Sequence, residues 1–144
     1  MKRFTKLTFL LLLLLLLSFV QVACNGDDIF GCGINTSCTD DFRSVVVSIQ
    51  DGDGNPVALD TYEVINLETG EPLDITFAFG DLQTAQETGM YPIANDGIFP
   101  SNQEVELQLR GFINEVEVIT SDYVVATDCC HIGLVSGDTE LILE

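Results

Sequence analysis

The residues of this chain best suited to chemistry are its five cysteines and its single histidine. Two of the cysteines stand directly before the histidine, in Cys129-Cys130-His131. Thiolate and imidazole groups are ligands that zinc prefers, but the usual Cys-x2-Cys or His-x3-His spacing is missing. With Cys32 and Cys38, the adjacent pair can instead form two disulfides in an oxidising compartment. We therefore favour disulfides over a metal site.

The adjacency of Cys129 and Cys130 restricts how the four cysteines pair. Four cysteines allow three pairings, and a bridge between neighbours would close a strained ring. We expect Cys32 and Cys38 each to bond one of the adjacent pair. Neighbours in a strand face opposite sides of a sheet, so this requires a bend or bulge at Cys129-Cys130, or a tether that crosses a strand edge. Closing a loop of about 90 residues would contribute roughly 4–5 kcal/mol for the first bridge and less for the second.

An acidic, glycine-rich turn is the second candidate site. Three of its residues match the first three ligand positions of a calcium loop: Asp51, Asp53 and Asn55. An EF-hand also needs Gly at the sixth position and Glu at the twelfth, where this chain has Pro56 and Tyr62, so an EF-hand is excluded. A looser calcium site between loops, with Asp96, is the alternative to an ordinary hairpin turn, which is the default.

No pattern typical of an enzyme is present. His131 is the only histidine, and neither a nucleophile elbow nor a phosphate-binding glycine loop occurs. The chain has no tryptophan for a sugar-binding platform, and its tyrosines fall in strand patterns where packing is the expected role: Tyr62, Tyr91 and Tyr123. We predict a protein that is not an enzyme and has no catalytic residues.

The beginning of the chain has the pattern of a removable export signal. Three basic residues precede an apolar core at 7–20, and a small residue, Ala23, stands directly before Cys24. The apolar core is shorter than the roughly 20 residues that a transmembrane helix needs. The sequence therefore predicts that residues 1–23 are removed during export.

The end of this signal, Val22-Ala23-Cys24, resembles the lipobox of bacterial lipoproteins, although Gln21 stands where that family usually has a Leu-like residue. The resemblance implies cleavage before Cys24 and acylation of this cysteine, with three acyl chains that suffice for stable anchoring. A plain signal peptide cut after Ala23 is the alternative. The following Asp27 and Asp28 resemble an export tag for the outer face of the outer membrane, with a solvated linker as the alternative reading.

Charge limits the partners of the mature protein. All 23 acidic residues follow Ala23, but only two basic residues do, Arg43 and Arg110, so the formal charge of the mature chain is −21. Such a surface repels phosphate groups, which excludes nucleic acid and disfavours direct contact with anionic lipids. The expected partners are the membrane, through the lipid on Cys24, and an unknown protein or glycan.

The rest of the chain alternates apolar and polar residues in short runs, which indicates strands. We place a lipid-anchored flexible tether at 24–42 and one domain at 43–144. Gly111 suggests a bulge or a bend and Pro92 an edge strand, and residues 81–89 form a helix or a loop. The predicted strands lie at 43–50, 61–67, 73–79, 90–94, 104–110, 115–118, 123–126, 132–135 and 141–143. Seven to nine short, mainly antiparallel strands predict an all-β fold, a β-sandwich of immunoglobulin-like architecture.

Residues 45–57, followed by Tyr62-Glu63-Val64, are similar to the first hairpin of carboxypeptidase regulatory-like and transthyretin-like domains. This resemblance implies a non-catalytic, prealbumin-type module and indicates no ligand. We therefore expect an outer-membrane, surface-exposed lipoprotein whose sandwich serves protein interaction or envelope structure. The alternative is an accessory lipoprotein that binds a glycan or calcium for an uptake system.

Overall fold

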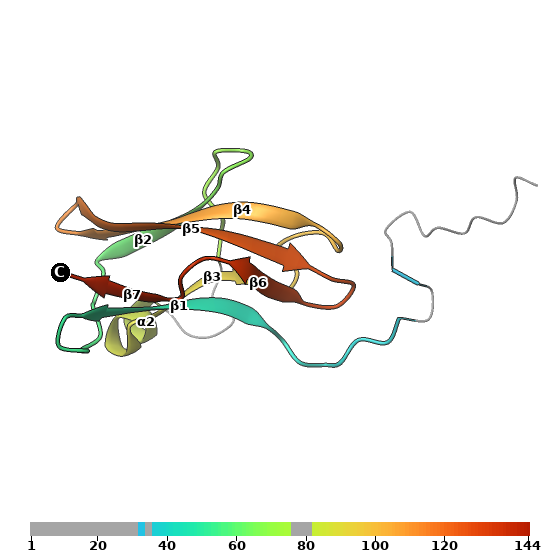
Figure 1. The fold of residues 1–144 in the computed structure, drawn as a ribbon, viewed down its shortest axis with the longest axis horizontal. Coiled ribbons are helices and arrows are strands. Elements are labelled where there is room, and N and C mark those ends of the chain that lie inside the picture. The colour runs from blue at the N-terminus through green and yellow to red at the C-terminus, as the bar shows by residue number, and fades with distance from the viewer. Residues whose placement is uncertain (1–31, 34–35, 76–81) are drawn as a thin grey trace, which may run out of the picture. The chain divides into compact units, whose positions relative to one another are not determined.

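The computed structural model describes residues 32–33, 36–75 and 82–144. The residues from Cys32 to Glu144 form one compact unit, and the description below concerns this unit. Its strands form one sheet of three and one sheet of four (Figure 1). The predicted all-β sandwich is therefore confirmed. The leader, Cys24, Asp27 and Asp28 lie outside the described residues, so the predictions made for them stay predictions.

The smaller sheet has the strand order β3 (Met90–Asn95), β1 (Ser44–Asp51) and β7 (Glu140–Leu143). β3 runs antiparallel to β1 and β7 runs parallel to it. Ser44, the first residue of β1, lies opposite Asn95, the last residue of β3. This register brings the residues just outside these two strand ends together, and the candidate site begins there.

The larger sheet is antiparallel throughout, with the order β2 (Thr61–Asn66), β4 (Glu104–Ile113), β5 (Val116–Thr127) and β6 (Ile132–Ser136). β4 and β5 form a hairpin closed by Asn114 and Glu115, whose φ angles of 51° and 65° suit a two-residue type I′ turn. The register shifts opposite Gly111 and Phe112, but the extra residue of this bulge is Val118 of β5 and not Gly111, where the sequence suggested a bulge or a bend.

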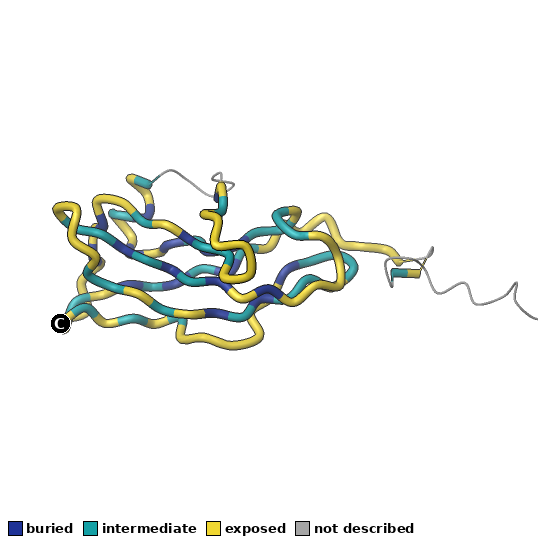
Figure 2. Tube along the Cα trace, turned by 90° about the horizontal axis from the view of Figure 1, so that it is seen from above, coloured by how far each residue is buried: buried dark blue, intermediate teal, exposed yellow. Residues whose placement is uncertain are grey.

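The hydrophobic core contains side chains from both sheets. Along β1, residues Val45, Val47 and Ile49 are buried and alternate with more exposed neighbours, because successive side chains of a strand face opposite sides (Figure 2). β4 contributes Leu107 and Leu109 in the same alternation. The period-two pattern of the sequence therefore identified the core face of both strands.

Two predicted strands differ from the structure. Residues 115–118 and 123–126 belong to the single strand β5, because pairing with β4 continues through the polar residues between them. The prediction at 73–79 is wrong in its described part, because residues 73–75 are in no strand and the isolated bridge between Pro72 and Ile65 comes before them. Residues 76–79 lie outside the described ranges.

The segment predicted as a helix or a loop contains the helix α2 (Leu82–Thr88). Gly89 follows it with a φ of 70°, and a Cβ atom at this position would lie 2.7 Å from the backbone oxygen of Ile49. Both the left-handed conformation and this close approach require glycine here. Within the described ranges, no helix is long and apolar enough to cross a membrane.

Candidate functional site

Two disulfides hold the N-terminal segment against one end of the sandwich. They join Cys32 to Cys129 and Cys38 to Cys130, with Cα atoms 5.4 and 5.3 Å apart. Each cysteine of the tether thus bonds one cysteine of the adjacent pair, as the sequence favoured. With all four sulfur atoms used in these bonds, no thiolate among them is left for a metal ion.

The adjacent cysteines can point to two partners because they lie in the bend between β5 and β6, outside any strand. Asp128 shapes this bend: its Oδ1 accepts hydrogen bonds from the backbone N–H of Cys130 at 2.6 Å and of His131 at 2.7 Å. These hydrogen bonds, from His131 and Cys130, lower the pKa of the Asp128 carboxyl group. The hydrogen bonds that Asp128 accepts from the residues after it therefore form the bend that the two bridges require.

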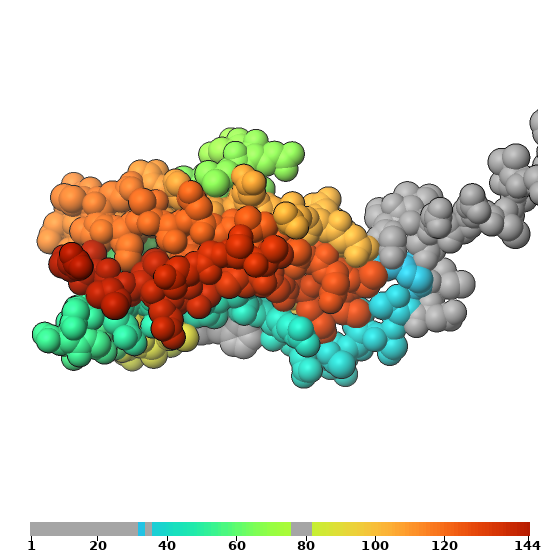
Figure 3. All heavy atoms as spheres, in the orientation of Figure 1, coloured from blue at the N-terminus to red at the C-terminus, as the bar shows by residue number. Residues whose placement is uncertain are grey.

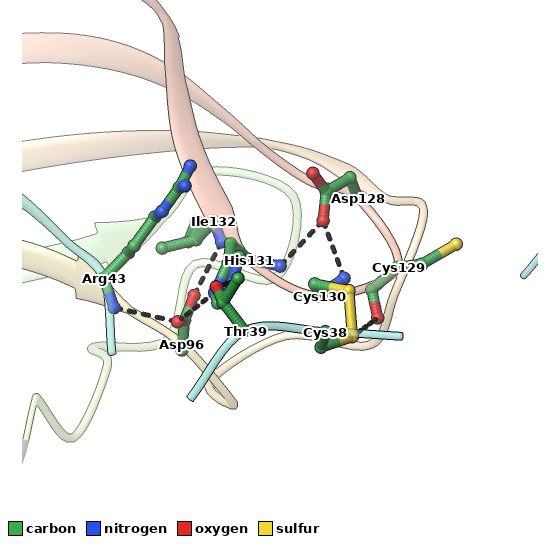
Figure 4. A network of polar contacts seen from close by, with 9 residues as sticks. All are labelled: Cys38, Thr39, Arg43, Asp96, Asp128, Cys129, Cys130, His131 and Ile132. Carbon is green, nitrogen blue, oxygen red and sulfur yellow. Dashed lines mark hydrogen bonds and ion pairs between the residues drawn. A yellow bond between two sulfur atoms is a disulfide. The ribbon is translucent and has the colours of Figure 1, made fainter. Parts of the chain in front are cut away.

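Asp96 lies directly after β3 and connects three parts of the chain (Figure 4). Its Oδ2 accepts a hydrogen bond from the Arg43 backbone N–H, which precedes β1, and lies 2.8 Å from the Nδ1 of His131. Its Oδ1 accepts a hydrogen bond from the Ile132 N–H of β6 at 2.7 Å. Because Arg43 and Ile132 flank or belong to strands of different sheets, Asp96 links the two sheets at this end.

The Asp96 and His131 side chains are largely removed from water, with 14% and 9% of their surface exposed. Burial alone would raise the pKa of Asp96, but the hydrogen bonds from His131 and from the Arg43 and Ile132 amides outweigh it and lower this pKa. A carboxylate can only accept hydrogen bonds, so the Nδ1 of His131 carries the shared proton. In the neutral ring, Nε2 can then accept a hydrogen bond from the Thr39 hydroxyl group, whose oxygen lies 3.0 Å away.

Thr39, His131 and Asp96 share the order of groups found in acyl-transfer triads: a hydroxyl, an imidazole and a carboxylate. Such a triad also needs donors aimed at a developing oxyanion. The nearby amides of Cys130 and His131 already donate to Asp128. A hollow of about 330 Å³ borders His131, but Thr39 is not part of its lining. What the contacts show is a connection: Thr39 of the tether bonds His131, and His131 bonds Asp96 at the end of both sheets.

The acidic turn after β1 holds itself closed. Asp51 accepts hydrogen bonds from the backbone N–H of Asp53 at 2.9 Å and from the backbone and side chain of Asn55 at 2.8–3.2 Å. These bonds, mainly those from Asn55, lower the pKa of Asp51. The described residues contain no group of three His, Cys, Asp or Glu side chains that could hold a metal ion. The geometry matches the hairpin turn that was the default interpretation.

The proposed participation of Asp96 in a calcium site with this turn is wrong. Asp51 is the last residue of β1, whereas Asp96 accepts a hydrogen bond from Arg43, which directly precedes the first residue of β1. An eight-residue strand separates its ends by about 23 Å at a rise of ~3.3 Å per residue. The two carboxylates therefore lie at opposite ends of the domain and cannot share an ion.

The three tyrosines support the fold with their hydroxyl groups. The buried Tyr91 donates a hydrogen bond to the Val57 carbonyl and accepts one from the Leu59 N–H. Tyr62 donates to the Pro92 carbonyl, and burial raises its pKa to about 12. Tyr123, 2% exposed, donates to the Asp138 carbonyl. Because Tyr91 and Tyr123 are buried, their ring faces cannot form a platform for a sugar, and the half-buried Tyr62 packs against Tyr91 with ring centroids 5.3 Å apart.

Comparisons with protein-family models, with curated proteins and with solved structures found no match. In the structure, the chain turns after β1, pairs once more with it through Gln50 and Pro56, and enters the other sheet as β2. The resemblance to carboxypeptidase regulatory-like and transthyretin-like domains thus stays a resemblance of one short segment.

The end of the sandwich that holds the two disulfides is called the cross-linked end below. Sequence reasoning did not identify Asp96, Asp128 and Thr39 as parts of it. Asp128 could have been found, because an Asp directly before a pair of residues in a turn often accepts their amide hydrogen bonds. Asp96 and Thr39 carry no local signal, since their partner His131 is 35 and 92 residues away in the sequence.

Proposed function

We propose that this protein is an exported lipoprotein, anchored in the outer membrane through Cys24, whose β-sandwich binds another protein or serves as part of the envelope. The proposal assigns no catalytic role to the domain. Its central element is a covalent connection from the lipid-bearing segment into the folded part of the chain, which would hold the domain at the membrane surface.

The two disulfides carry this proposal. Disulfides persist in secreted and envelope proteins and are rare in reducing compartments. Both connect the N-terminal segment to the Cys129-Cys130 bend rather than crossing the core. This placement suits a domain held by its N-terminal end, because the bridges fix Cys32 and Cys38 on the sandwich and so shorten the chain between Cys24 and the folded part.

The charge of the domain supports anchoring by lipid rather than by the protein surface. A mature chain of charge −21 is repelled by anionic lipid head groups. Two or more acyl chains, at about 0.8 kcal/mol for each buried CH₂ group, give stable attachment without any contribution from the domain.

Fractionation of cells that express the wild type or Cys24→Ser tests the anchor. The wild type should stay with the outer membrane after a high-salt wash, because salt screens charges but does not weaken lipid insertion. Cys24→Ser should yield a folded protein in the soluble fraction, and mass spectrometry should find diacylglycerol only on the wild-type N-terminal peptide. Retention of Cys24→Ser in the membrane, or an unmodified Cys24, would refute the anchor.

A further inference from the structure

The two arginines of the mature chain differ in their surroundings. Arg110 on β4 bonds Glu117 and lies 3.9 Å from Glu63. The guanidinium of Arg43, which precedes β1, forms no salt bridge and no hydrogen bond with the described residues. This is notable because the mature chain carries 23 acidic residues. The donors of the Arg43 side chain are therefore available to a molecule from outside.

Arg43 borders the hollow of about 330 Å³ at the cross-linked end, where the tether lies beside the bend between β5 and β6 (Figure 3). The lining includes Ala126 of β5 and Gly133 of β6, which are cross-strand partners and face the same side of the sheet. One has only a methyl group and the other no side chain, so the surface is recessed here. Leu134 and Val135, 39% and 55% exposed, give the hollow an apolar border. Its volume lies at the lower end of the range of small-molecule sites, about 300–1,000 Å³.

Asp128 adds a negative charge to the same lining. Its Oδ1 accepts the hydrogen bonds from His131 and Cys130, whereas its Oδ2 accepts none from the described residues. These hydrogen bonds, and to a smaller extent the charge of Arg43, lower the pKa of Asp128, so its carboxylate is charged at neutral pH. In the view of Figure 4, the Arg43 guanidinium and this second carboxylate oxygen both point upward, and no dashed line ends on either. Because the two groups form no salt bridge with each other, each can bind an opposite charge.

This pair of charges selects the class of ligand. A simple anion is attracted by Arg43 but repelled by Asp128 and by the charge of −21 on the mature chain, and a simple cation is repelled by Arg43. A molecule with both a carboxylate and an ammonium group has no net charge and can satisfy both residues. Guanidinium binds carboxylate with two parallel hydrogen bonds. The apolar border at Leu134 and Val135 favours an apolar side chain on the same molecule.

We propose that this hollow binds a zwitterionic amino acid or dipeptide with an apolar side chain, whose carboxylate pairs with Arg43 and whose ammonium group pairs with Asp128. The inference goes beyond the proposed interaction function and depends neither on the lipid anchor nor on a protein partner. A phospholipid head group with a phosphate and an ammonium group shares part of this chemistry, and the experiment below distinguishes the two sources.

Titration calorimetry of the intact protein in detergent tests the class of ligand, at about 0.15 M salt to screen the charge of the domain. Leucine and leucyl-leucine are each compared with their N-acetylated and C-amidated forms. We expect at least one zwitterion to bind and its two blocked forms to bind at least about tenfold more weakly, because each lacks one charge-assisted contact. Glycerophosphoethanolamine should also bind more weakly, because it has no apolar side chain.

Variants of the protein locate the contact. Arg43→Gln and Asp128→Asn should each weaken binding about tenfold or more. Asp128→Asn keeps a side-chain oxygen that can accept the hydrogen bonds of the bend. Gly133→Leu should abolish binding, because it fills the hollow, and a Cβ atom at this position meets no atom within 4 Å. Arg110→Gln is the matched control and should leave binding unchanged.

Nuclear magnetic resonance of the arginine side chains gives a second, independent test. The Nε–H signal that is missing from the spectrum of Arg43→Gln belongs to Arg43, and Arg110→Gln identifies the other in the same way. We expect the bound zwitterion to shift the Arg43 signal of the wild type and to leave the Arg110 signal unchanged.

Several outcomes would overturn the site: no binding of either zwitterion, a blocked form that binds as tightly, or a loss in Arg110→Gln equal to that in Arg43→Gln. An unchanged Arg43 signal at saturating ligand would also overturn it. Tighter binding of glycerophosphoethanolamine would assign the hollow to a membrane head group instead. Melting temperatures show whether each variant is folded, and if one is not, the shift of the Arg43 signal in the wild type decides.

Discussion

An aspartate accepts hydrogen bonds at each end of β1, but the bonded residues lie at very different separations along the chain. Asp51 accepts hydrogen bonds from residues no more than four positions away. Asp96 bonds Arg43, His131 and Ile132, which are 35 to 53 positions away. The first aspartate forms a turn, whereas the second connects two sheets. The same side chain thus gives local order at one end of the strand and tertiary order at the other.

The covalent bonds add to this difference. The end that contains Asp96 also holds two disulfides that join residues 97 and 92 positions apart. The Asp51 end has no disulfide within the described residues. We therefore expect the cross-linked end to contribute far more to the free energy of unfolding than the turn at Asp51.

Removal of both bridges should have the largest effect. In Cys129→Ser with Cys130→Ser, the unfolded chain regains the freedom of a loop of about 90 residues, which corresponds to roughly 4–5 kcal/mol for the first bridge and less for the second. Urea unfolding of the wild type with and without reductant should show the same loss. An unchanged denaturation midpoint would show that the bridges do not stabilise this end.

Substitution of the two aspartates compares the ends directly. Asp96→Ala leaves the buried partners of a charged acceptor unsatisfied and should cost about 2–3 kcal/mol. Asp51→Ala disrupts only an exposed turn and should lower the free energy of unfolding less. Urea unfolding of both variants measures the difference, and equal losses would contradict the distinction drawn between the two ends.

Acid should remove the contribution of Asp96 to stability by titration. The pKa of Asp96 is lowered by folding, so the unfolded chain binds this proton first as the pH falls. The stabilisation is present above the unfolded pKa of about 3.9 and is lost as the pH falls through the lower folded pKa. The free energy of unfolding of Asp96→Asn should therefore fall less steeply below about pH 4 than that of the wild type. Parallel curves of the free energy of unfolding against pH would show that the contacts of Asp96 do not stabilise the folded protein.

Calcium should have the smallest effect. To bind an ion, the Asp51 carboxylate would have to give up hydrogen bonds from Asp53 and Asn55. We expect equal melting temperatures in calcium and in a chelator. A saturable rise with calcium concentration would instead demonstrate binding to the folded state and would make the turn a ligand site.

The sequence predicted the local features of this molecule well. The alternation of Val45, Val47 and Ile49 identified a core strand, and the residues Asp51 to Asn55 identified a turn, because neighbouring residues alone determine both. The cysteines predicted cross-links because a disulfide needs a second cysteine, and only a few were available. Asp96 was assigned to the wrong end of the domain, because a carboxylate has many potential partners and only the register of β1 with β3 selects among them.

The pairing of the cysteines tests the account of the cross-linked end most directly. Native protein is blocked with an alkylating agent, digested without reduction, and its linked peptides are identified by mass spectrometry. We expect one linkage between Cys32 and Cys129 and one between Cys38 and Cys130, with none of the four alkylated. A bond between Cys129 and Cys130, or an alkylated cysteine among the four, would contradict the attachment of the tether to the sandwich.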